Sequence, residues 1–251
     1  MSDLPTLVFA HANGFPAGTY ESLFEIWRHA GWQVHALERF GHDPRFPVTS
    51  NWSKLRDQLI EFVERQVKPH QPVALVGHSL GGLVSLLVAC KRPDLVAQLV
   101  MLDSPVVRGW RAHSVRAVKS MRLIQHVGPG KVSASRRFEW PSRQAVFEHF
   151  ASKRKFARWD PRVLQDYVQA GFEDAGGKTR LSFTREVETR VYNTLPHHLD
   201  GVLRRHPPRC PVSFIAGTQS EELRSAGLEG TRQLVRENLF WIEGSHLYPM
   251  E

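Results

Sequence analysis

The sequence predicts an α/β protein in which a mostly parallel sheet carries helices on both faces and holds one inserted helical segment. Up to Pro105, short apolar runs alternate with stretches whose apolar residues recur at a helical period. This alternation builds a parallel sheet covered by helices. After a long interval without a convincing buried strand, the same alternation returns near residue 212. A chain of 251 residues can bury one sizeable core, so we expect a single domain with an inserted lobe.

Four strands and three helices are expected before Pro105. Strands are predicted where apolar and β-branched residues form short runs, and helices where apolar residues recur with a period near 3.6. The first helix should follow a cap at Thr19, and the third is carried by the apolar run Leu83–Ala89. The expected strands are 6–10, 33–37, 73–77 and 98–103, and the second helix is expected at 52–67.

The inserted segment is predicted to be a helical cap. Amphipathic stretches occur within it at Arg143–Ala151 and Pro161–Ala170. After it, strands are expected at Val212–Gly217 and Leu239–Ile242, with a helix around Gly230–Arg236 between them. We therefore assign residues 1–106 and 207–251 to the core and residues 107–206 to a cap over the carboxyl edge of the sheet, where open α/β sheets bind ligands.

The most informative motif is Gly77-His78-Ser79-Leu80-Gly81, which fits the pattern G-x-S-x-G. An expected strand precedes it and an expected helix follows it, which is the setting of a nucleophile elbow. A serine hydroxyl is a poor nucleophile at neutral pH and needs a base, for which histidine is suited. Among the 13 histidines, His246 stands in a glycine-led loop after the last expected strand, at the sheet edge where the elbow also points.

With these features in this order, the whole chain resembles the α/β-hydrolase superfamily, and most closely its capped esterase-like members. The elbow carries the resemblance together with His11-Ala12-Asn13-Gly14, Arg39-Phe40-Gly41-His42 and Gly244-Ser245-His246. The first of these loops has alanine where the family usually has the glycine of His-Gly. The resemblance implies Ser79 as nucleophile, His246 as base, and an oxyanion hole formed by the backbone N–H groups of Asn13 and Leu80.

The acid that should orient His246 has more than one candidate. Most of the superfamily has it after the strand that here is Val212–Ala216, but Ser220 stands where the aspartate is expected. Asp103 ends the strand that follows the elbow helix, a second location that some esterase-like members use. Glu221 or Glu222 could also serve, Asp103 could be a turn residue, and the protein could lack a functional acid.

The cap is expected to decide the substrate, and its composition offers two interpretations. Residues 107–205 hold 20 Lys and Arg against 9 Asp and Glu, a net charge of +11, whereas the rest of the chain carries −3. These cations form a solvated face or meet an anionic group. The aromatic residues form the core of the cap or line an apolar acyl pocket. They are Trp110, Phe138, Trp140, Phe147, Phe150, Phe156 and Trp159, and the candidate cations are Arg111, Arg136, Arg137, Arg154 and Lys155.

The composition also bears on the cellular location and on the classes of partner that we expect. No apolar run reaches membrane-spanning length, no recognised nucleic-acid module occurs, and the first residues do not form a secretory signal. With only two cysteines, a disulfide scaffold is not expected and a reducing cytoplasm fits. The sequence itself does not indicate an oligomeric state.

The leading hypothesis is therefore a soluble cytoplasmic serine hydrolase that acts on a small-molecule carboxylic ester or thioester. Such a reaction requires no metal and no organic cofactor. Two alternatives reuse the same residues: hydrolysis of a carbon–carbon bond and a cofactor-free perhydrolase reaction. A third is an inactive homologue that only binds a ligand, which the missing aspartate at Ser220 favours.

Overall fold

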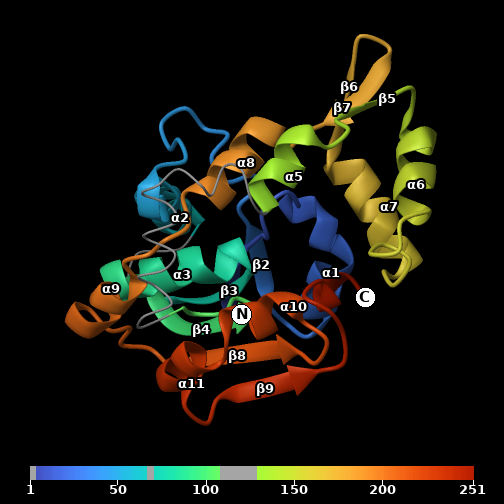
Figure 1. Ribbon diagram of the computed structural model, residues 1–251. Coiled ribbons are helices and arrows are strands. Elements are labelled where there is room, and N and C mark those ends of the chain that lie inside the picture. Colours follow the sequence, from blue (N-terminus) through green and yellow to red (C-terminus); the bar gives the residue numbers. More distant parts are fainter. Residues whose placement is uncertain (1–3, 67–70, 108–128) are drawn as a thin grey trace.

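The computed structural model describes residues 4–66, 71–107 and 129–251 (Figure 1). Its main sheet consists of β1 (Thr6–Ala10), β2 (Gln33–Ala36), β3 (Val73–His78), β4 (Val96–Leu102), β8 (Val212–Gly217) and β9 (Leu239–Ile242). The helices associated with it are α1 (Glu21–His29), α2 (Ser53–Gln66), α3 (Leu80–Lys91), α10 (Glu221–Ala226) and α11 (Glu229–Val235). Short 3-10 helices lie at Ala17–Tyr20, Ser50–Trp52, Pro93–Leu95 and Tyr248–Met250.

The six strands lie in the order β2-β1-β3-β4-β8-β9, and every neighbouring pair is parallel. This confirms the predicted fold class. The chain passes outward from β1 to β2 and then returns to β3 on the other side of β1. Loops that leave two neighbouring strands in opposite directions open a crevice at the carboxyl edge of a sheet. The loop after β1 and the Ser79 corner after β3 flank this point.

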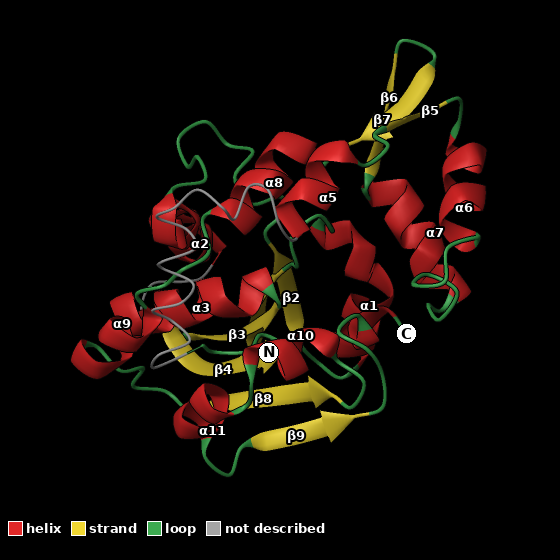
Figure 2. Cartoon of the chain, viewed as in Figure 1, coloured by secondary structure: helices red, strands yellow, loops and turns green. Residues whose placement is uncertain are grey.

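Each face of the sheet has its own hydrophobic core, because successive side chains of a strand point to opposite faces. Val8 and Ala10 of β1 pack with α2 and α3, whereas Leu7 and Phe9 pack with α1. Helices thus cover both faces of the sheet (Figure 2). The expected cap of α1 at Thr19 is wrong, because a 3-10 helix spans Ala17–Tyr20 and Tyr20 occupies the N-cap position.

The segment between β4 and β8 contains helices α5 (Pro129–Ser135), α6 (Arg143–Ala151), α7 (Pro161–Ala170), α8 (Arg185–Asn193) and α9 (Leu199–Arg205). The sequence predicts a helical segment, but the structure also contains strands here. A three-stranded antiparallel sheet joins β5 (Glu139–Trp140), β7 (Lys178–Leu181) and β6 (Phe172–Ala175). The turn between β6 and β7 is Gly176-Gly177, and both glycines have positive φ, as the tight turns of hairpins require. These strands are short and half exposed, so a search for buried apolar runs misses them.

Of the aromatic residues predicted for this segment, three are buried, Phe147 and Phe156 are partly buried, and Phe138 is exposed. Trp140, Phe150 and Trp159 are buried in the hydrophobic core that also holds Phe24 of α1 and Phe9 of β1. Trp110 and Arg111 lie outside the described residues. Among the helices that the structure describes, none is long and apolar enough to cross a membrane.

Candidate active site

Ser79 sits at a tight corner between the end of β3 and the start of α3. Its backbone has φ 52° and ψ −113°, a conformation that is rare outside glycine and marks a strained turn. The motif glycines allow this corner. A Cβ on Gly81 would lie 1.9 Å from the carbonyl oxygen of Ala10, and one on Gly77 would lie 2.4 Å from the carbonyl carbon of Gly81. The corner brings Ser79 to the wall of a cavity.

His246 lies between Ser79 and Asp103. Its Nε2 is 3.0 Å from Oγ of Ser79, and its Nδ1 is 2.6 Å from Oδ2 of Asp103. With the proton of the neutral imidazole on Nδ1, the carboxylate accepts that N–H and Nε2 accepts the serine O–H. The Asp103 side chain is fully buried, while 14 % of the His246 side chain is exposed. Such a chain of hydrogen bonds can move a proton from Ser79 to His246.

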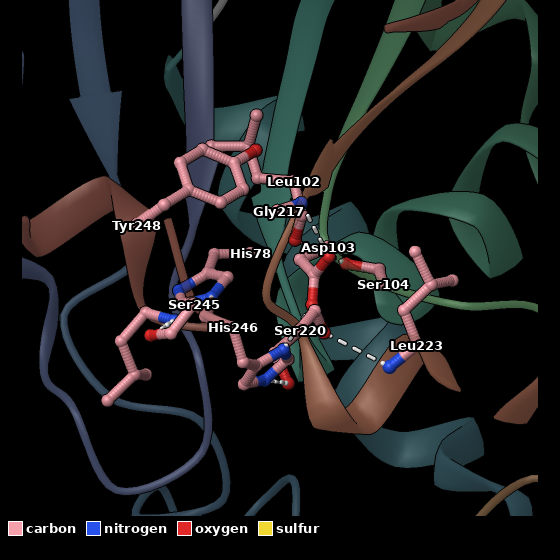
Figure 3. Close-up of polar contacts among 12 residues, drawn as sticks. His78, Leu102, Asp103, Ser104, Gly217, Ser220, Leu223, Ser245, His246 and Tyr248 are labelled. Carbon is pink, nitrogen blue, oxygen red and sulfur yellow. Dashed lines mark hydrogen bonds and ion pairs between the residues drawn. The ribbon is translucent and has the colours of Figure 1, made fainter. Parts of the chain in front are cut away.

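The Asp103 carboxylate is also bound by the loop that follows β8. Its Oδ1 accepts the backbone N–H of Gly217 at 3.1 Å, and its Oδ2 accepts the hydroxyl of Ser220 at 2.5 Å (Figure 3). The Ser220 oxygen in turn accepts the N–H of Leu223 at 3.0 Å and so caps α10. The residue that stands where an aspartate was expected thus holds the carboxylate of Asp103.

Glu221 and Glu222 lie elsewhere. Both are exposed in the first turn of α10 and both line the cavity. Within the described chain, neither has a hydrogen bond or ion pair with His246. The structure therefore brings Asp103, and not these two glutamates, to the imidazole.

His78 joins the loop after β1 to the loop of His246. Its Nε2–H donates to the carbonyl oxygen of His246 at 2.8 Å, so its Nδ1 accepts the hydroxyl of Tyr20 at 2.7 Å. The Tyr20 oxygen accepts the N–H of Ala12 at 3.2 Å. Burial lowers the pKa of His78 to about 3, which keeps it neutral at physiological pH. His78 thus fixes the backbone of His246 and does not face Ser79.

A second buried histidine shapes the loop that carries Asn13. Nδ1–H of His11 donates to the carbonyl of Ala12 at 2.7 Å, and its Nε2 accepts the N–H of Phe40 at 3.0 Å. Burial lowers the pKa of His11 to about 4. Asn13 and Ser79 both line the cavity, and the side-chain amide of Asn13 donates to the carbonyl of Glu188.

Two backbone N–H groups are left to donate: that of Leu80, which directly follows Ser79, and that of Asn13, which lines the same cavity as Ser79. Leu80 is the first residue of α3, so its N–H has no acceptor within the helix. In the described part of the chain, the N–H of Asn13 has no acceptor either. These are the two groups that the sequence nominated for an oxyanion hole.

The cavity has a volume of about 700 Å³ and a markedly charged lining. Phe156 is the one residue of the described aromatic candidates that lines it, so those side chains do not form a wide apolar pocket. Arg136 and Glu188 form an ion pair on its wall, with 2.7 Å between nitrogen and oxygen. Burial raises the pKa of Glu188, and the guanidinium of Arg136 opposes this shift. In the described ranges, no group of three or more His, Cys, Asp or Glu could hold a metal ion.

Sequence reasoning missed three parts of this site: the bond of Ser220 to Asp103, the link through Tyr20, and the Arg136–Glu188 pair. Each joins residues far apart in the chain, and no local pattern marks them. The one signal in the sequence is Ser220 itself, which departs from the family pattern at the position where an aspartate is expected.

Known proteins resemble this chain in both sequence and structure. A family model described as "Alpha/beta hydrolase family" matches residues 7–251. Mouse monoglyceride lipase is 27 % identical over 139 residues, which are 51 % of this chain and 46 % of the lipase. A type I acyl-CoA thioesterase, mpaH, of Penicillium roqueforti is 24 % identical over 69 % of this chain and 41 % of the relative. The chain thus spans about half the length of the curated relatives it matches.

Among solved structures, the thioesterase domain from the curacin biosynthetic pathway superposes with a TM-score of 0.74. The superposition covers 99 % of this chain and 87 % of the other, at 16 % sequence identity. At this low sequence identity, the structural similarity shows a shared fold and nothing more.

Proposed function

We propose that this chain, which belongs to the alpha/beta hydrolase family, is a serine hydrolase that cleaves carboxylic esters or thioesters through an acyl-enzyme. The observation that carries the proposal is the continuous chain of contacts from Ser79 through His246 to the buried Asp103, at the wall of a cavity. The names of the lipase and thioesterase relatives agree with an ester or thioester substrate.

The proposed reaction begins when Ser79 attacks the acyl carbonyl and His246 takes the serine proton on Nε2. Asp103 holds the imidazole in the required tautomer and stabilises the imidazolium that forms. The N–H groups of Asn13 and Leu80 bind the developing oxyanion. His246 then protonates the leaving group, and a water molecule activated by the same histidine releases the acid and restores Ser79.

We further propose that residues 107–206 act as a cap. Arg136, Phe156 and Glu188 of this segment line the cavity together with Ser79 and His246 of the sheet edge. A substrate that reaches Ser79 would therefore contact both parts of the chain. Cys90 and Cys210 are free thiols, which agrees with the proposed cytoplasmic location.

The contact between Asp103 and His246 favours an enzyme over a binding-only homologue, because the latter hypothesis depended on a missing acid. A fluorophosphonate probe tests the nucleophile directly. The folded protein should be labelled at Ser79, found by mass spectrometry of its peptides, and Ser79→Ala should lose both labelling and hydrolysis of 4-nitrophenyl esters. Ser85→Ala is the matched control, because Ser85 is buried in α3, the helix that follows Ser79, and lies outside the cavity. A folded protein that is not labelled would refute the proposal.

A further inference from the structure

One wall of the cavity is a cationic loop between α6 and α7. Residues 153–158 read Lys-Arg-Lys-Phe-Ala-Arg, and Arg154, Lys155 and Arg158 line the cavity together with Phe156. In Figure 1 this loop lies beside the carboxyl-terminal segment.

The loop is anchored at its end and through its aromatic residue. The N–H of Asp160 donates to the carbonyl of Met250 at 3.0 Å, and the ring of Phe156 lies 4.7 Å from that of Phe150 and 4.6 Å from that of Trp159. The cations are therefore presented to the cavity by a packed element.

Two of these cations have no protein counterion in the part of the chain that the structure describes. Arg158 is engaged, because its guanidinium pairs with Glu251 at 3.1 Å and donates to the side chain of Gln219 at 2.7 Å. Arg154 and Lys155 are exposed and have neither a hydrogen bond nor an ion pair within the described ranges. Lys153 shows that the positive charges also repel one another. Burial is the main cause that lowers the pKa of Lys153, and the charge of Arg136 lowers it further.

None of the carboxylates that line the cavity forms an ion pair with Arg154 or Lys155 in the described chain. Glu188 is paired with Arg136, and Glu221 and Glu222 lie on α10, where Arg224 also lines the cavity. In total, five Arg and Lys and three Glu line the cavity.

The part of the lining near Asn13 disfavours contact with a hydrocarbon chain, whereas Phe15, Phe156 and Leu247 give the cavity apolar surface as well. The buried Oδ1 of Asn13 has no hydrogen-bond partner in the described structure, and Glu188 is buried close to it. Covering such groups with methylene groups costs free energy because they lose water without gaining a partner.

We propose that the substrate of this site carries an anionic group, a phosphate or a carboxylate, which Arg154 and Lys155 bind while its ester or thioester carbonyl reaches Ser79. This inference rests on the proposed hydrolase function. A phosphate would belong to a nucleotide-bearing leaving group such as that of a coenzyme A thioester, and a carboxylate would belong to a dicarboxylic acyl group. Both present oxygen anions that guanidinium and ammonium groups bind.

Two pairs of substrates separate these sources. Butyryl-coenzyme A is compared with the butyryl thioester of N-acetylcysteamine, which lacks the phosphates, and the 4-nitrophenyl monoester of glutarate is compared with 4-nitrophenyl valerate, which lacks the carboxylate. We expect kcat/KM to favour the anionic member of one pair by about tenfold or more at low salt, and the preference to fall as salt rises.

The variant R154Q/K155Q should lose about tenfold more kcat/KM on the preferred anionic substrate than on its neutral partner. The control is K54Q/K91Q, which removes two exposed cations outside the cavity and should change neither. Equal kcat/KM for both members of both pairs, or equal losses on anionic and neutral substrates in R154Q/K155Q, would overturn the inference.

Binding to the Ser79→Ala variant distinguishes this inference from the proposed function. Calorimetry with coenzyme A and with glutarate should detect one of them, and R154Q/K155Q in the same background should weaken it. Anion binding without any turnover by the unmodified protein would refute the hydrolase proposal and support the anion site. Absence of binding for both anions, with ester hydrolysis intact, would refute the anion site alone.

Discussion

Replacement of Asp103 by asparagine should move the proton of the neutral His246 imidazole from Nδ1 to Nε2. Oδ1 of Asp103 accepts the buried N–H of Gly217, and Oδ2 lies 2.6 Å from Nδ1 of His246. The asparagine must keep its carbonyl oxygen toward Gly217, because a buried N–H needs an acceptor. Its NH2 group then donates to Nδ1 of His246, so the proton of the neutral imidazole moves to Nε2. An Nε2 that carries a proton cannot accept the proton of Ser79.

A triad histidine in the wrong tautomer lowers kcat by about 10⁴-fold, which corresponds to about 5.4 kcal/mol of transition-state stabilisation. The free energy of unfolding should change less. Asparagine has nearly the shape of aspartate, and the main loss is the charged acceptor for the hydroxyl of Ser220, worth about 1.5–3 kcal/mol. Activity should therefore fall far more than stability.

The assay compares kcat on a 4-nitrophenyl ester, together with thermal unfolding, for the unmodified protein, Asp103→Asn and Glu221→Gln. Glu221 lines the cavity without contacting His246 in the described structure, so Glu221→Gln is the matched control and should retain kcat. Near-normal turnover in a folded Asp103→Asn variant would refute the reasoning. A large loss in Glu221→Gln alone would assign the acid to Glu221.

Two further predictions concern the supports of this site. Ser220→Ala should reduce the free energy of unfolding by about 2 kcal/mol, because Asp103 loses a donor and the N–H of Leu223 loses its cap, and it should lower kcat about tenfold. Ser220→Thr should restore much of both, and an unchanged denaturant midpoint for Ser220→Ala would contradict the prediction. Burial lowers the pKa of His11 to about 4 and that of His78 to about 3. Below pH 6.5 the unfolded chain binds protons there that the native state does not, so stability should fall with pH from 6.5 toward these values, by about 1.4 kcal/mol per pH unit for each histidine. Equal urea midpoints at pH 7.5 and pH 5.5 would refute this.

The sheet was predictable because its signals are local. All six strands lie within two residues of their expected bounds, and the largest difference is at β4, which begins at Val96 and not at Gln98. Buried parallel strands read as apolar runs, and the helices between them show a clear period. The β6–β7 hairpin was missed because its strands are half exposed, although Gly176-Gly177 marks its turn.

The sequence by itself determined the corner at Ser79, because the glycines of the motif are needed within a few residues of the strained serine. It also nominated the loop of His246 from its place after the last strand. Only the tertiary structure decided which carboxylate meets that histidine. Asp103 and Ser220 lie in the loops that follow different strands, and their bond depends on β4 and β8 lying side by side in the sheet.

The character of the cavity was likewise decided in three dimensions. From the sequence, both aromatic and cationic residues of the inserted segment were candidates for its lining. Folding buries Trp140, Phe150 and Trp159 in one core with Tyr167 and Phe172, because apolar side chains leave water together, and this leaves Arg154 and Lys155 at the cavity. This division of aromatic residues to the core and cations to the cavity depends on packing between segments that are distant in the sequence. A local residue pattern does not show that packing.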